Sequence, residues 1–158
     1  MQKITPFLWF DKEAEEAAKF YVSVFRDSRI VNVTHYTEGG PMPKGSVMTV
    51  DFELDGLRFT ALNAGPHHQF NDAISFTVRC ESQQEVDEFW SKLTAGGGQE
   101  VQCGWLKDKF GLSWQVTPTA LMRMLGDPDR KKAGRVMQAM MGMKKIDIAG
   151  LQRAYDAA

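Results

Sequence analysis

Hydrophobic and polar positions follow two successive blocks of the same order along the chain. The first block predicts a strand, a helix and three further strands, over 4–10, 12–25, 29–36, 47–54 and 57–62. The helix is indicated by Ala17, Phe20, Tyr21 and Val24, which recur at helical spacing and form one apolar stripe. A tight turn at 55–56 joins the last two strands.

The second block repeats this order from residue 73 onward. It predicts strands over 73–78, 100–106 and 113–117, with a helix after the first of them. Ser82 caps this helix, and Glu85 completes a capping box. The glycines at 96–98 end the helix.

The two blocks can be superposed by fixed offsets, which indicates an internal repeat. Adding 69 maps Phe7 onto Phe76, and adding 55 maps Phe59 onto Trp114. Further helices are predicted after the second block. We therefore expect an α+β fold of two tandem βαβββ modules with a C-terminal helical extension. The boundaries expected within this single domain are module one 1–66, module two 70–118 and helical tail 119–158.

Composition and charge exclude several classes of protein. The 158 residues include 19 basic and 20 acidic side chains, so the basic footprint of a nucleic-acid-binding protein is absent. Two cysteines are too few for a disulfide scaffold, and no apolar run is long enough to span a membrane. We therefore expect a soluble, cytoplasmic protein that binds neither nucleic acid nor membrane.

Particular motifs strengthen this picture by resemblance. They are the run 4–11, Glu15-Glu16-Ala17, Phe20-Tyr21, Asn63-x-Gly65-Pro66, Phe70-Asn71, 73–76, 111–115, 137–140 and 143–147. Together they resemble the PhnB-like family, whose members often carry the label 3-demethylubiquinone-9 3-methyltransferase. That family is part of the vicinal oxygen chelate superfamily, with glyoxalases, extradiol dioxygenases and bleomycin-resistance proteins. The resemblance implies a glyoxalase-like domain with a ligand cleft.

Metal-dependent members of that superfamily take four ligands from the first and last strands of the two modules. Carried over by strand register, those positions are Ile4, Thr60, Ala73 and Gln115. Aliphatic side chains cannot bind a cation, and a hydroxyl or a neutral amide is a poor ligand for zinc, iron or manganese. We therefore expect no metal and no cofactor.

Five residues are the candidates for the ligand cleft. Thr60 and Gln115 occupy the last-strand positions, and strand alternation places Arg58 and Ser75 on the same inward side. Trp105 is the candidate for a cleft wall. Hydroxyls, an amide and a cation can orient a polar or anionic small molecule without a metal.

The other aromatic and histidine residues have structural interpretations. By the same alternation Trp9 and Trp114 should pack under the helices. His67 and His68 lie in the linker between the modules, where an exposed loop is the simpler interpretation, and His35 stands alone in a strand. No catalytic residue is assigned.

The leading functional hypothesis is a metal-independent small-molecule-binding protein. One alternative is a lyase or isomerase acting on a small oxygenated substrate, with His35 or Arg58 assisting; another is an interaction module whose cleft is vestigial. Methyl transfer is disfavoured because the glycines at 96–98 follow a helix rather than a strand. Met137, Met140 and Met141 form a stripe on the tail, for which we expect packing on the domain or on a second copy in a homodimer.

Overall fold

The computed structural model describes all residues, 1–158, as two compact units. Unit 1 spans 1–70 and unit 2 spans 71–158, and each is described by itself. None of the five helices reaches the length and apolarity that crossing a membrane requires.

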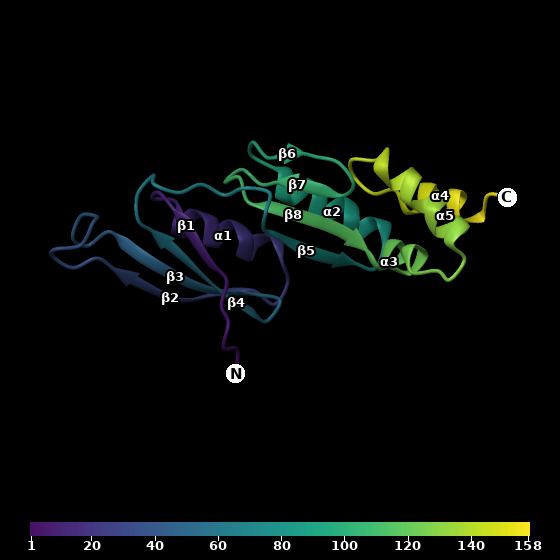
Figure 1. The fold of residues 1–158 in the computed structure, drawn as a ribbon. Coiled ribbons are helices and arrows are strands. Elements are labelled where there is room, and N and C mark those ends of the chain that lie inside the picture. The colour runs from purple at the N-terminus through teal and green to yellow at the C-terminus, as the bar shows by residue number, and fades with distance from the viewer. The chain divides into compact units, whose positions relative to one another are not determined.

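Unit 1 is a four-stranded sheet with one helix, in the predicted order. Its elements are β1 (Phe7–Phe10), α1 (Ala14–Val24), β2 (Arg29–His35), β3 (Val47–Leu54) and β4 (Leu57–Asn63). The sheet order is β1-β4-β3-β2, with β1 parallel to β4 and the other pairs antiparallel (Figure 1). Because parallel strands need a crossover connection, the chain passes through α1 before it returns to β1.

The core of unit 1 lies between α1 and one face of this sheet. Ala17 and Tyr21 of α1 are fully buried, and the Tyr21 ring stacks on Phe52 at 6.1 Å between centroids. Phe52 in turn stacks on Phe59 of β4 at 5.4 Å. Burying each of these aromatic side chains contributes roughly 2–3 kcal/mol. The core therefore takes every second residue of β3 and β4, and the residues between them face the other way.

Unit 2 repeats this plan and adds a helical tail. Its elements are β5 (Ser75–Cys80), α2 (Gln83–Thr94), β6 (Gln99–Glu100), β7 (Trp105–Lys107), β8 (Ser113–Pro118), α3 (Thr119–Leu125), α4 (Arg130–Met141) and α5 (Ile148–Asp156). The sheet order is β5-β8-β7-β6, with β5 parallel to β8. Ser82 caps α2 as predicted, since its hydroxyl accepts from the amide of Glu85 at 3.2 Å. The α+β fold of two βαβββ modules is thus confirmed.

The strand register corrects the repeat by one residue at its start. Phe7 pairs with Thr60 in unit 1, and Thr77 pairs with Gln115 in unit 2. The offset of 55 equates Thr60 with Gln115. The residue of module two that is equivalent to Phe7 is therefore Thr77 and not Phe76. The helices keep the offset of 69, because the segment between strand and helix has three residues at 11–13 but only two at 81–82.

The strand predicted over 100–106 is wrong as one element. The structure divides it into β6 and β7, which pair as a hairpin with Glu100 opposite Leu106. Cys103 and Gly104 have φ angles of 59° and 83° in the turn between them. This left-handed backbone breaks the ladder.

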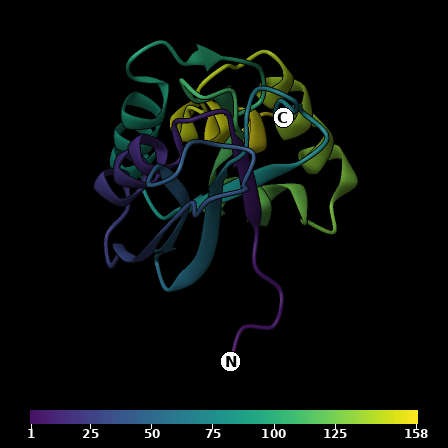
Figure 2. The same cartoon turned by 90° about the vertical axis from the view of Figure 1, so that its left-hand side faces the viewer.

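The tail helices pack around a core of their own. Leu121, Met124, Val136, Ile146 and Leu151 form this cluster. The segment before α5 holds the tail to the rest of unit 2, because the amides of Cys103 and Gly104 each donate at 2.8 Å to the carbonyls of Met143 and Lys144. Figures 1 and 2 show α3, α4 and α5 grouped together at the C-terminal end of the chain.

Asn63 joins three elements of unit 1 from the end of β4. Its side chain accepts from the amide of Ala14 at 2.8 Å, at the start of α1, and donates to the carbonyl of Val47 at 3.1 Å, at the start of β3. Asn63 is only 5% exposed, so these bonds are shielded from water. This one amide therefore fixes where the helix begins relative to the sheet.

Replacing Asn63 with alanine should lower the free energy of unfolding by about 2–3 kcal/mol, because a buried amide and a carbonyl lose their partner. Urea unfolding measures this, with an unchanged m-value showing that only stability has altered. Asn32→Ala, at an exposed position of β2, is the control and should cost less than about 0.5 kcal/mol. Equal costs for the two variants would contradict this role for Asn63.

Candidate functional site

The face of the unit 1 sheet away from α1, called here the helix-free face of unit 1, is lined by polar side chains. Thr60 of β4 donates from its hydroxyl to Asp51 Oδ1 of β3 at 2.7 Å. Further along, the hydroxyls of Thr34 and Thr49 share a hydrogen bond of 2.6 Å between β2 and β3. These pairs lie directly opposite one another in the strand register, so they form successive rungs across the sheet.

One rung of this face joins two arginines to a single carboxylate. Glu53 of β3 lies opposite Arg29 of β2 and Arg58 of β4. Arg29 Nε donates to Glu53 Oε2 at 2.9 Å, and Arg58 Nε donates to Glu53 Oε1 at 3.1 Å. The bond from Arg29, with a smaller contribution from Arg58, lowers the pKa of Glu53, which keeps this carboxylate ionised.

The helix-free face of unit 2, on the side of its sheet away from α2, carries the other candidates. Gln115 of β8 lies between Trp105 of β7 and Thr77 of β5 in the strand register. Its Nε2 donates to Ser75 Oγ of β5 at 2.9 Å. The amide oxygen of Gln115 takes part in no protein hydrogen bond, and the Ser75 hydroxyl keeps its own proton to donate.

A second polar group lies next to Gln115 on this face. Ser113 donates to Asp72 Oδ1 at 3.2 Å, and Lys107 Nζ lies 3.1 Å from the same oxygen. The bond from Lys107 and then that from Ser113 lower the pKa of Asp72. Asp72 therefore lies at one end of the polar side chains on this face and links Ser113 with Lys107.

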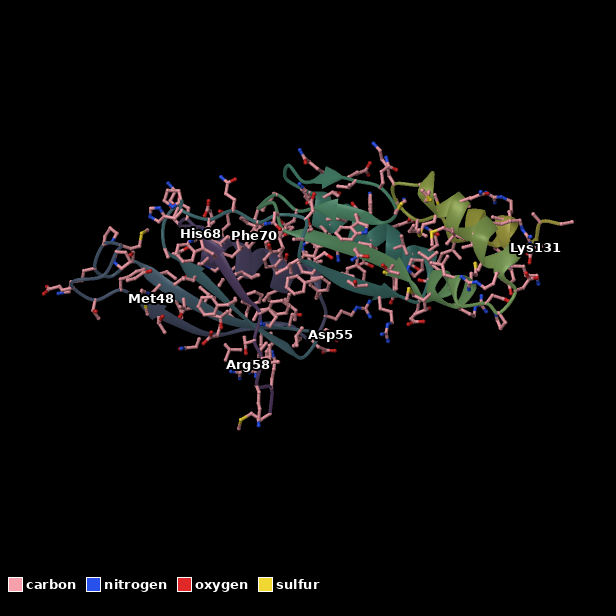
Figure 3. The ribbon with its side chains drawn as sticks, viewed as in Figure 1. Met48, Asp55, Arg58, His68, Phe70 and Lys131 are labelled. Atoms are coloured by element: carbon pink, nitrogen blue, oxygen red, sulfur yellow. The ribbon has the colours of Figure 1, made fainter.

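The structure thus brings the predicted site residues together in two groups. Thr60 and Arg58 share the helix-free face of unit 1, and Gln115, Ser75 and Trp105 share that of unit 2. Figure 3 shows Arg58 near the β3–β4 turn, with Asp55 at that turn and Met48 toward the other end of β3.

Sequence reasoning missed the carboxylates and one of the arginines. Asp51, Glu53, Arg29 and Asp72 all bond to the polar side chains of these faces. A signal for Glu53 was present, since the two-residue turn at 55–56 sets Glu53 opposite Arg58. Arg29 gave no such signal, because irregularities interrupt the register of β2 with β3.

The residues at the superfamily's metal positions do not fit a metal ion. Ile4 and Ala73 precede β1 and β5, and the side chains next to Thr60 and Gln115 in register are Phe7 and Thr77. None of these is a ligand of a transition metal. The chain also contains no group of three or more histidine, cysteine, aspartate or glutamate side chains arranged to hold an ion.

The prediction for Trp9 is wrong, whereas that for Trp114 is confirmed. Trp114 is 3% exposed and donates from its indole to Asp108 Oδ2 at 2.9 Å. In β1 it is Leu8 and Phe10 that are buried against the helix, so Trp9 points to the other face. The cause is the one-residue change of offset between β1 and β5.

Trp9 instead packs against the segment that follows β4. Its indole donates to the carbonyl of Gly65 at 2.9 Å, and its ring meets His68 edge to face at 4.7 Å. His35 and His67 are exposed. No histidine is therefore paired with a carboxylate that would orient it as a base.

The thiol of Cys80 is not activated as a nucleophile. Cys80 is buried, and burial raises its pKa to about 12, with smaller contributions from Glu85 and Glu81. A thiol with that pKa carries almost no thiolate near neutral pH, and the thiolate is the nucleophile. Cys103 lies in the β6–β7 turn.

Comparisons with known proteins place the chain in a family. The 3-demethylubiquinone-9 3-methyltransferase family profile matches residues 2–117. The solved PhnB protein from Bacillus cereus, which bears the same enzyme name, is 38% identical; the match covers 74% of this chain and 99% of that protein, with a TM-score of 0.67. No curated protein matches the chain.

Two more distant structures share the fold. Protein PA1353 from Pseudomonas aeruginosa is 19% identical, with 75% of this chain and 98% of that protein covered and a TM-score of 0.61. The fosfomycin resistance protein FosX from Listeria monocytogenes is 15% identical, with 80% and 98% covered and a TM-score of 0.59. The chain therefore belongs to the 3-demethylubiquinone-9 3-methyltransferase (PhnB-like) family of the vicinal oxygen chelate superfamily.

Proposed function

We propose that this protein binds a small polar molecule on its helix-free faces without a metal ion. The observation that carries the proposal is the pairing of Gln115 with Ser75. The hydrogen bond from Gln115 Nε2 to Ser75 Oγ is 2.9 Å long. It leaves the amide oxygen of Gln115 and the hydroxyl proton of Ser75 free to bond to a ligand. A ligand with one donor and one acceptor group can bond to both.

The surroundings of this pair support recognition of a polar, partly flat molecule. Trp105 lies next to Gln115 in register and is half-buried, so it offers an aromatic wall beside the polar pair. Aromatic surface combined with a few oriented polar groups is typical of small-molecule sites. Thr60 occupies the equivalent position in unit 1 and supplies a hydroxyl there.

Methyl transfer is suggested by the family's name but has little support from the residues. The glycines that could have cradled a nucleotide-like cofactor end α2 instead, with φ angles of 75° at Gly96 and 117° at Gly97. A cofactor cradle of that type follows a strand and opens a helix. The alternative is a lyase or isomerase that acts on a small oxygenated substrate, with Arg58 assisting on the helix-free face of unit 1.

The purified protein should contain no stoichiometric transition metal, because the expected ligand positions carry Ile4, Thr60, Ala73 and Gln115, which are poor ligands or none at all. Elemental analysis of the purified protein measures this. In a thermal-shift screen, zinc, manganese and S-adenosylmethionine should leave Tm unchanged while some small polar organics raise it. One metal per chain, lost on mutation of Gln115, would overturn the proposal.

Gln115→Leu should weaken binding of an organic hit from that screen by roughly 1–3 kcal/mol, because the variant keeps a similar volume but loses the amide. Isothermal titration calorimetry measures the affinity. Gln138→Leu, at an exposed position of α4, is the matched control and should bind as the wild type does. Equal affinities for wild type and Gln115→Leu would remove Gln115 from the site.

We also propose a homodimer in which the tail contributes to the interface. Met140 packs against the tail core, but Met137 and Met141 of α4 are 42% and 63% exposed. Light scattering should give twice the chain mass, and Met137→Glu with Met141→Glu should shift it toward the monomer. Gln138→Glu on the same helix is the control. A monomer mass for the wild type at all concentrations would contradict this proposal.

A further inference from the structure

The rung of Arg29, Glu53 and Arg58 leaves most of its hydrogen-bonding capacity unused. Each guanidinium donates through Nε alone, and no protein group bonds to the terminal nitrogens of either one. The two side chains are 66% and 49% exposed, whereas that of Glu53 is 19% exposed. Four terminal nitrogens therefore face outward around one central carboxylate.

The two guanidiniums converge on the same point from opposite sides. Arg29 lies on β2 and Arg58 on β4, and neighbouring strands are about 4.8 Å apart, so both reach inward to the central strand β3. Each oxygen of Glu53 is taken by one arginine. One negative charge cannot neutralise two positive ones, so this rung carries a net charge of +1.

The next rung carries the opposite charge. Asp51 precedes Glu53 by two residues on the same face, which is about 7 Å along a strand. Its Oδ1 accepts from Thr60, and its Oδ2 takes part in no protein hydrogen bond. The opposite residue on β2 is the neutral Asn32, so this rung has a net charge of −1. The face therefore presents a cationic group beside an anionic one.

We propose that Arg29 and Arg58 bind the oxyanion of a dipolar small molecule and that Asp51 Oδ2 binds an ammonium group of the same molecule. Planar guanidinium groups match the geometry of carboxylate and phosphate oxygens. Glu53 is a positioning residue that holds both guanidiniums through Nε. This inference rests on the proposed function, since it takes the helix-free face of unit 1 as a binding face, and it names the class of ligand.

A purely structural role explains this arrangement less well. Exposed ion pairs contribute little to stability, with a median of about 0–1 kcal/mol. A pair that served only to link strands would need one arginine for one carboxylate. The second guanidinium adds charge that the protein does not compensate within the rung.

The experiment uses butyrate and 4-aminobutyrate, which differ by one ammonium group. The wild-type protein is titrated with each compound at constant ionic strength, and the 15N signals of the arginine Nε groups are followed. The signals of Arg29 and Arg58 should shift with both compounds. The amine should bind several-fold more tightly. Arg29→Gln and Arg58→Gln should each lower the affinity for both compounds roughly tenfold, since each variant loses a charge-assisted hydrogen bond to the ligand. Lys19→Gln on α1 removes an exposed cation paired with Glu15 and is the control. It should leave the affinity for both compounds unchanged.

Asp51→Asn separates the two halves of the proposal. It should abolish the advantage of 4-aminobutyrate over butyrate and leave butyrate binding unchanged. No response of Arg29 and Arg58 to either compound, or the same loss from Lys19→Gln, would overturn the inference. Such a failure is distinct from failure of the proposed function, because thermal-shift hits that depend on Gln115 would survive it.

Discussion

Parallel pairing between the first and last strands of each βαβββ module is the interaction on which the rest of the structure depends. β1 pairs with β4, and β5 pairs with β8. Two parallel neighbours cannot be joined by a tight turn, so a helix follows the first strand and covers one face of the sheet. Buried residues such as Tyr21 and Trp90 make that face the core. The other face is left to side chains that the fold does not need for its core.

Those remaining side chains are mostly polar and are bonded to one another across strands. Thr60 and Gln115 occupy equivalent places in the two units, and each bonds to a neighbouring strand: Thr60 to Asp51 of β3, and Gln115 to Ser75 of β5. Each bond orients a side chain without exhausting its capacity, as the free oxygens of Asp51 and Gln115 show. Oriented polar groups lose little conformational entropy when a ligand binds, which favours recognition of small molecules. Relatives that use a metal would place it at positions which here carry neutral side chains.

Much of this could be predicted from the sequence, because local patterns determined it. The alternation over 47–54 set the bounds of β3, and the serine before α2 set where that helix begins. The orientation of Trp9 could not be predicted, because it depends on one residue more or less in the segment between strand and helix. The Arg29–Glu53 bond was beyond reach for a similar reason, since bulges decide which residues of β2 and β3 lie opposite each other. The attachment of the tail depends on backbone bonds from Cys103 and Gly104, which leave no pattern in side chains.

We propose that the helix-free faces, and not the helices or the tail, bind the ligand. Backbone amide chemical shifts during titration with a stabilising small molecule test this most directly. We expect the largest changes on β4 and β8, around Thr60 and Gln115, with α1, α2 and α4 nearly unaffected. Largest changes on those helices, with β4 and β8 unchanged, would contradict it.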